Sequence, residues 1–294
     1  MLQHKPHSTM KLSVPVLLFF LVANLSAAYG QVDGWYVELG AGPAFSGNLA
    51  QEGFNLDSFC YPGFICCPDL DGCNNNNPNQ QSGYRWNYQI PTDPGFAFRV
   101  GAGREQGSLR IDLNVQYSAR NLQQIFSQIT HLDGSPAPQF DPNSGVQVTT
   151  IAAIGRLRVA SLRINTFLDL LPRDRAFRPY LGIGTGAARS TVTDLYYEER
   201  FSCTGQPCSG DLSGYDSLQD EDLADVVLLA SGHAGFEYVL TEKILTGVRF
   251  SYTLLQDFNS QGDYTTHRVE NLTNTTIFSK LNLFATMATV RYRL

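Results

Sequence analysis

The sequence predicts an all-β fold, an eight-stranded antiparallel transmembrane β-barrel with long extracellular loops. Three observations support this: eight stretches long enough to cross a membrane, connections that alternate between long and short, and a preceding secretory leader. Membrane strands need about 9–11 residues, and bacterial barrels join them by short turns on one side and longer loops on the other. The connections have 49, 3, 39, 5, 36, 4 and 24 residues. The expected strands are Gly34–Phe45, Gly95–Arg104, Ser108–Arg120, Ala160–Leu171, Phe177–Ala188, Asp225–Tyr238, Lys243–Leu255 and Lys280–Leu294.

Residues 1–30 are expected to form a cleaved signal peptide, which leaves 31–294 as the barrel domain. Lys11 precedes an apolar run from Leu12 to Leu25, and small residues follow near Ala28 and Gly30. The alternative is a membrane anchor, but the run is shorter than the about 20 apolar residues of a spanning helix. Export of this kind predicts a location in the cell outer membrane of a Gram-negative bacterium.

Apolar and polar residues alternate along the strands and so divide them into a lipid face and a lumen face. In residues 108–117, Leu109, Ile111 and Leu113 alternate with Arg110 and Asp112. A soluble sandwich or a lipocalin-like barrel would also alternate, but the strict alternation of loop lengths favours the membrane barrel. The pattern places a charge network in the lumen: Glu38, Arg99, Arg110, Asp112, Arg163, Asp169, His233, Glu237, Arg249 and Arg291.

Charges of both signs inside eight strands are expected to pair and fill the lumen, because such a barrel is only wide enough for side chains. His233 and Glu237 share a strand face and could be a catalytic couple or a pH-sensitive gate. The simpler interpretation is a polar filler, because the local sequence supplies no nucleophile. We therefore expect no enzymatic activity, and at most a narrow conductance.

Aromatic residues near the strand ends are interpreted as membrane-interface girdles. They are Trp35, Tyr36, Phe177, Tyr180, Tyr238, Tyr252 and Tyr292.

Four stretches resemble the opacity-type, porin-family eight-stranded outer-membrane barrels. They are GWYVELGAGPAF at 34–45, FRPYLGIGTGAA at 177–188, the hairpin at 235–254 and the closing MATVRYRL. The resemblance implies a barrel fold and an outer-membrane location. It implies little about activity, because this family includes adhesins, small pores, anchors and a few lipid-modifying enzymes.

Six cysteines fall in the expected outer loops, where oxidising conditions favour disulfides: Cys60, Cys66, Cys67, Cys73, Cys203 and Cys208. The short spacing predicts a local Cys203–Cys208 bridge and leaves three pairings open among the other four. Their spacing does not match a zinc site, and the nearby acidic residues do not form a calcium loop. No metal or cofactor is expected.

The leading functional expectation is a structural and surface-interaction role, adhesin-like, with disulfide-braced loops presented outside the cell. The alternative is a narrow porin for small solutes, and a lipid-modifying enzyme is a third candidate. Expected partners are outer-membrane lipid and an extracellular or host-surface ligand; the acidic mature chain, net −8 without the two lysines of the leader, argues against nucleic acid. The oligomeric state stays open.

Residues 146–159 are expected to extend the fourth strand and pair with residues 121–130, although a ten-stranded barrel is the alternative.

Overall fold

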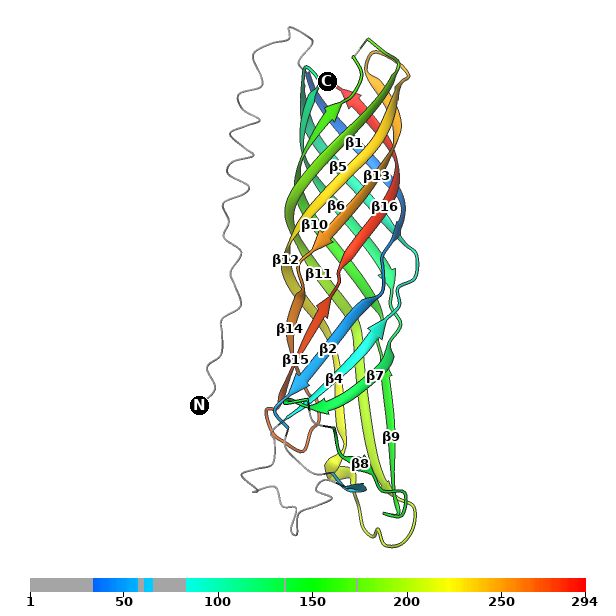
Figure 1. Ribbon diagram of the computed structural model, residues 1–294, viewed down its shortest axis with the longest axis vertical. Coiled ribbons are helices and arrows are strands. Elements are labelled where there is room, and N and C mark those ends of the chain that lie inside the picture. Colours follow the sequence, from blue (N-terminus) through cyan, green and yellow to red (C-terminus); the bar gives the residue numbers. More distant parts are fainter. Residues whose placement is uncertain (1–33, 58–60, 66–82, 135, 173) are drawn as a thin grey trace.

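The computed structural model describes residues 34–57, 61–65, 83–134, 136–172 and 174–294. Eight antiparallel strands close into a barrel in the order β10-β6-β5-β1-β16-β13-β12-β11, and β11 pairs again with β10 (Figure 1). These strands are β1 (Gly34–Phe45), β5 (Gly95–Gln106), β6 (Leu109–Asn121), β10 (Arg156–Asp169), β11 (Phe177–Cys203), β12 (Ser217–Val239), β13 (Ile244–Leu255) and β16 (Asn282–Arg293).

The barrel forms because the two faces of each strand have different chemistry. On β10, Leu162 and Ile164 are exposed and point outward, whereas Ser161 and Arg163 are buried inside. The register keeps like faces together: Leu162 lies opposite Val115 of β6, and Arg163 lies opposite Asn114. The outward face is therefore apolar and the inward face at this level of the barrel is polar, as in a barrel surrounded by lipid. No helix among the described residues is long and apolar enough to cross a membrane.

The prediction of eight barrel strands is confirmed. The predicted extension of the fourth strand is correct only from Arg156, which lies opposite Asn121 of β6, and is wrong for residues 146–153. Residues Val146–Ala153 form a separate strand, β9, which pairs with β11 rather than with residues 121–130. The strand is interrupted at Gly155, between β9 and β10. The Gly155 N–H donates to the Thr193 carbonyl, and the Gly155 carbonyl accepts a hydrogen bond from the Leu122 N–H. A register shift in β11 between Val192 and Leu195 accompanies the break.

Strands β11 and β12 continue well beyond the predicted ends at Ala188 and Asp225, because their alternation continues into segments that looked like polar loops. The connection expected at residues 189–224 is thus a strand up to Cys203 and again from Ser217 onward. The other long connections also contain strands: β2 (Leu49–Asn55), β3 (Phe64–Ile65), β4 (Tyr84–Ile90), β7 (Ile125–His131), β8 (Gln139–Phe140), β14 (Phe258–Asp263) and β15 (Thr273–Ser279).

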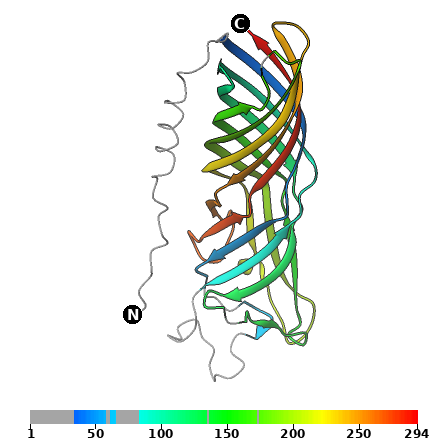
Figure 2. The same cartoon turned by 45° about the horizontal axis from the view of Figure 1, so that its top comes forward.

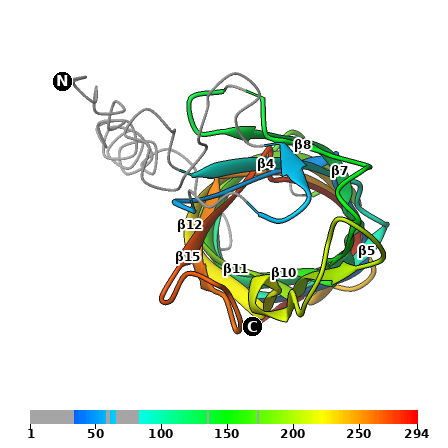
Figure 3. The same ribbon diagram turned by 90° about the horizontal axis from the view of Figure 1, so that it is seen from below.

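These strands extend the barrel wall at the end opposite the C-terminus (Figure 2). β14, β15, β2, β4 and β7 form one sheet in that order, and β9 pairs with the distal half of β11. We call this set, together with the distal halves of β11 and β12, the outer extension. Within the described residues β7 and β9 each pair on one edge only, so the wall has a seam between them. Figure 3 shows the ring of strands from the extension side.

A disulfide joins Cys203 at the end of β11 to Cys208, as the spacing predicts. It closes the tip between the two longest strands, β11 and β12. The predicted signal peptide, 1–30, and Cys60, Cys66, Cys67 and Cys73 lie outside the described residues.

Candidate ligand-binding cavity and the barrel interior

Five arginines and five carboxylates are buried together in the half of the barrel nearest the short turns. The Glu237 carboxylate accepts hydrogen bonds from Arg110, at 2.8 Å, and from Arg291. Glu38 accepts from Arg249 at 2.8 Å, and Asp112 accepts from Arg99. We call this set the charged layer: Arg99, Arg110, Arg163, Arg249, Arg291, Glu38, Glu105, Asp112, Asp169 and Glu237. Glu105 was not in the predicted network, because the strand expected at Gly95–Arg104 ended one residue before it; β5 continues to Gln106.

Two of the predicted interface aromatics, Tyr36 and Tyr180, lie in the lumen instead. Both are 1 % exposed. The Tyr36 ring lies 5.0 Å from the Arg291 guanidinium, and the Tyr180 ring lies 4.5 Å from that of Arg110. A Cβ on Gly103 or Gly235 would approach within about 2.5–2.6 Å of these rings, so glycine on the neighbouring strand makes room for each tyrosine. The other five, Trp35, Phe177, Tyr238, Tyr252 and Tyr292, are exposed on the outer surface.

His233 is buried in the lumen, but its partners differ from the one that the sequence pattern indicated. Its Nε2 lies 3.1 Å from Asn165 Oδ1 and 3.0 Å from Ser231 Oγ. The Glu237 carboxylate instead accepts hydrogen bonds from Arg110 and Arg291. The His233 ring also packs against Phe167, at 5.5 Å between centroids.

An apolar cluster fills the interior where the barrel meets the outer extension. It combines inward side chains of β10, β11 and β12 with side chains of β2, β4, β14 and β15, so it reaches across the interior. We call it the apolar layer: Leu49, Ile90, Leu122, Leu157, Val159, Ala188, Val192, Leu195, Leu223, Val227, Leu229, Phe258, Phe278 and Leu281. A packed apolar layer of this kind is a barrier to hydrated ions.

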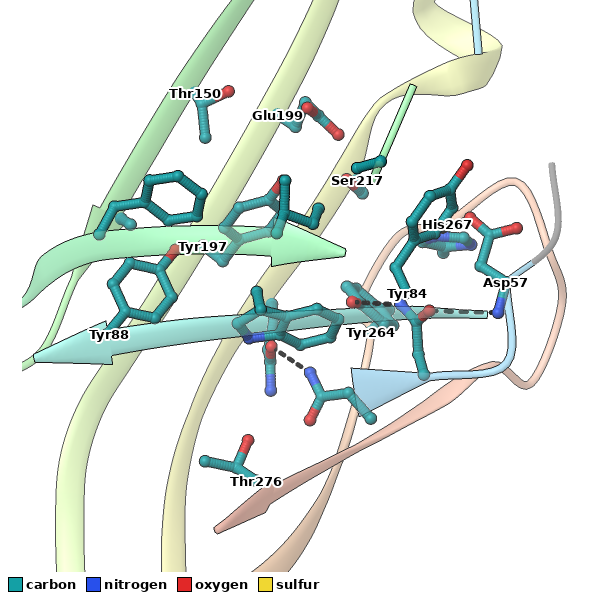
Figure 4. Close-up of a pocket in the computed structure, with 18 of the residues that line it drawn as sticks. Asp57, Tyr84, Tyr88, Thr150, Tyr197, Glu199, Ser217, Tyr264, His267 and Thr276 are labelled. Carbon is teal, nitrogen blue, oxygen red and sulfur yellow. Dashed lines mark hydrogen bonds and ion pairs between the residues drawn. The ribbon is translucent and has the colours of Figure 1, made fainter. Parts of the chain in front are cut away.

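On the side of the apolar layer that faces away from the charged layer, the outer extension encloses a cavity of about 570 Å³. This is within the usual range for a small-molecule site. Its lining comes from β2, β4, β7, β9, β11, β12 and β15 and from the segment at 264–267 (Figure 4). Phe126 and Ile129 of β7 and Thr150 and Ala152 of β9 line it on either side of the seam.

Aromatic side chains dominate this aromatic cavity. Three of them stand on one face of β4, since Tyr84, Trp86 and Tyr88 alternate with Arg85 and Asn87. Tyr61 stacks on Phe201 with centroids 5.5 Å apart, and Tyr88 meets Phe126 edge-on at 5.5 Å. The aromatic side chains in the lining include Tyr61, Tyr84, Trp86, Tyr88, Phe126, Tyr197, Phe201 and Tyr264.

One corner of the cavity holds a hydrogen-bonded set of Asp57, Tyr61 and His267. The Tyr61 hydroxyl donates to Asp57 at 2.5 Å, and His267 Nε2 lies 3.3 Å from that hydroxyl. Since the Val269 N–H donates to His267 Nδ1 at 3.0 Å, the neutral ring carries its proton on Nε2 and donates toward Tyr61. Burial lowers the pKa of His267, so this ring is uncharged at pH 7.

Glu199 of β11 is a second acid in the lining (Figure 4). Burial raises the pKa of its carboxyl to about 6, even though Tyr197 hydrogen-bonds it; Asp57 and Asp216 act in the same direction as burial. No Lys or Arg is among the described residues that line the cavity. The cavity is therefore aromatic, acidic and without a cation of its own. No group of three or more potential metal-binding side chains occurs in the described part of the chain.

No protein-family model matches the chain. No curated protein matches it either. Several solved structures are similar. Neisserial surface protein A (NspA) is 14 % identical, with 90 % of this chain and 100 % of that chain covered and a TM-score of 0.36. OprG from Pseudomonas aeruginosa is 12 % identical, with 89 % and 97 % covered and a TM-score of 0.39. The outer membrane protease OmpT from Escherichia coli is 10 % identical, with 89 % and 97 % covered and a TM-score of 0.36.

The residues of the aromatic cavity were missing from the sequence prediction, which treated their segments as loops. A signal was present in YRWNYQI at 84–90, where aromatic residues recur at every second position. Glu199 and Tyr197 likewise alternate with Glu198 and Arg200. The pairing of these segments into one wall, however, depends on contacts far apart in the chain.

Proposed function

We propose that this protein is an outer-membrane anchor for a surface ligand-binding cavity, a form of the expected surface-interaction role. The observation that carries the proposal is that the aromatic cavity lies in the outer extension, next to a barrel whose interior is filled by the charged layer and the apolar layer. Because side chains fill the barrel at these two levels, it acts as a rigid support. The cavity lies in the outer extension, on the side of the long connections, which faces the exterior in bacterial barrels.

The outer surface of the barrel supports its placement in a membrane. The outward residues of β12 are apolar from Val226 to Tyr238, and acidic residues begin on that face at Asp222. On β10 and β11 the apolar belt ends at Arg158 and Arg189, which are exposed. This arrangement is typical of an apolar belt that ends at the lipid headgroups.

Replacing Ile164 by Arg is expected to destabilise the barrel in lipid vesicles by about 2–4 kcal/mol, because the residue projects from the middle of the apolar belt. The control is Ala224→Arg, an outward position on β12 at the border of the belt, where the cost falls to about 0–1 kcal/mol. The free energy of unfolding is measured from urea titrations of the protein refolded in vesicles. Equal effects of the two substitutions would contradict the membrane placement.

The refolded protein is expected to produce no discrete conductance steps in planar bilayers, because both layers exclude hydrated ions from the barrel interior. Folding of the same sample is checked by its resistance to protease and by its heat-dependent mobility on gels. Reproducible single-channel steps from a folded sample would contradict this proposal and favour the narrow-porin alternative. A large porin run in the same bilayer serves as the positive control.

A further inference from the structure

The aromatic cavity has the chemistry of a cation site, and no described part of the chain places a cation in it. Glu199 and Asp57 supply its carboxylates, and burial keeps its only described histidine, His267, neutral. A carboxylate that is removed from water is costly unless a positive charge or several donors compensate it. Among the described residues, Tyr197 forms a side-chain hydrogen bond with Glu199, and the other charged groups that act on Glu199 are the acids Asp57 and Asp216.

The aromatic rings provide the second half of such a site. Ring faces attract cations, and the attraction is strongest for a ligand ammonium that is desolvated between them. Organic cations such as quaternary ammonium groups use this combination of rings and a nearby acid. An inorganic ion would instead need several oxygen ligands, and the described lining has no such cluster.

The polar groups of the lining include acceptors that a ligand could use. Asn274 is 1 % exposed and donates through its amide to Gln219 at 2.5 Å, while its Oδ1 has no hydrogen-bond partner among the described residues. Gln124 donates to Gln51 at 2.8 Å, and its own Oε1 is also without a partner there. A ligand that donates hydrogen bonds would satisfy these oxygens, whereas an anion would find mainly acceptors.

We propose that the aromatic cavity binds an organic cation of drug-like size, with its ammonium group held between Glu199 and the aromatic rings. This inference rests on the proposed function, because it names the ligand class of the same cavity. Anionic ligands are excluded by the two carboxylates. Neutral ligands would leave Glu199 without a counter-charge.

The proposal predicts that affinity falls as the pH drops through about 6, the raised pKa of Glu199. The carboxyl is protonated below that pH and no longer attracts the cation. The charged groups that face Glu199 are both acids, Asp57 and Asp216, since burial raises the pKa values of the surrounding phenols and keeps them neutral. Those phenols belong to Tyr61, Tyr84, Tyr88, Tyr197 and Tyr264.

The experiment compares choline, which stays charged at every pH, with its uncharged isostere 3,3-dimethylbutan-1-ol. The chain has two tryptophans, so Trp35→Phe leaves Trp86, which lines the cavity, as the fluorescence reporter. The full mature protein is refolded in nanodiscs of zwitterion-free, uncharged lipid, because choline headgroups would compete. We expect saturable binding of choline at pH 8, about tenfold or more weaker binding of the isostere, and loss of choline binding toward pH 5.

Two variants assign the effect to one side chain. Glu199→Gln is expected to weaken choline binding about tenfold or more and to remove its pH dependence. Glu198→Gln is the matched control, because this neighbour points to the other face of β11 and pairs with Arg200 at 2.6 Å. Glu199→Gln should still fold, since it removes a desolvated charge and keeps the side-chain shape.

Three outcomes would overturn the cation proposal. Equal binding of choline and the isostere would show a cavity that binds ligands without selecting charge, which leaves the proposed function intact. Binding of choline that is unchanged in Glu199→Gln would remove the residue on which the argument depends. Absence of saturable binding of choline by the folded protein would reject the ligand class, whereas the proposed function fails separately, through conductance.

Discussion

Replacing Glu237 by Gln is expected to destabilise the barrel by about 3–5 kcal/mol, among the largest effects of a single substitution in this protein. Glu237 is 1 % exposed and accepts hydrogen bonds from Arg110 and Arg291, which are equally buried. Glutamine keeps the shape but removes the negative charge, so the five arginines of the charged layer would face four carboxylates of that layer. An unbalanced buried charge is costly because water cannot reach it.

The measurement is the free energy of unfolding in urea for the protein refolded in vesicles. Glu242→Gln is the control, since it makes the same chemical change in the exposed turn that follows β12, where an effect within about 0.5 kcal/mol is expected. The double variant Glu237→Gln with Arg291→Met restores the charge balance and should recover part of the loss. A single variant as stable as the wild type would show that the charged layer tolerates an excess of positive charge.

The alternation of residues predicted most of the barrel and most of its charged layer. Arg110 and Asp112 alternate with Ile111 and Leu113, and this local rule decides which face meets lipid. The error at Tyr36 broke the same rule, because Tyr36 lies two residues before Glu38 and must share its inward face. The aromatic side chain suggested a position at the membrane interface, but the alternation of residues along the strand places Tyr36 inside the barrel.

The outer extension could not be predicted in the same way, because its assembly depends on distant segments. β2 pairs with β4 on one edge and with β15 on the other, and about 220 residues separate β2 from β15. Asn, Gly and Pro in these connections favoured turns, and short strands between turns have weak signals. β9 could pair either with β11 or with residues 121–130, and the local sequence does not distinguish these two partners. The cavity exists only once these pairings are made.

Phe167 is expected to hold the middle of the charged layer together, and Phe167→Ala should cost about 3–5 kcal/mol. Its ring is 1 % exposed and meets Tyr180 edge-on at 5.6 Å. The guanidinium groups of Arg249, Arg110 and Arg99 lie 4.7, 5.3 and 5.8 Å from the ring centroid. One neutral ring therefore separates three cations that would otherwise repel one another.

Phe167→Leu distinguishes the ring's charge distribution from its volume. Leucine fills much of the same space but has no π face, so it should still lose about 0.5–2 kcal/mol for each cation–π contact that was effective. Phe98→Leu is the control, because Phe98 points into the lipid, where one apolar side chain replaces another at little cost. If Phe167→Leu were as stable as the wild type, the ring would act by volume alone. The arginines would then be held apart by the carboxylates and not by the aromatic face.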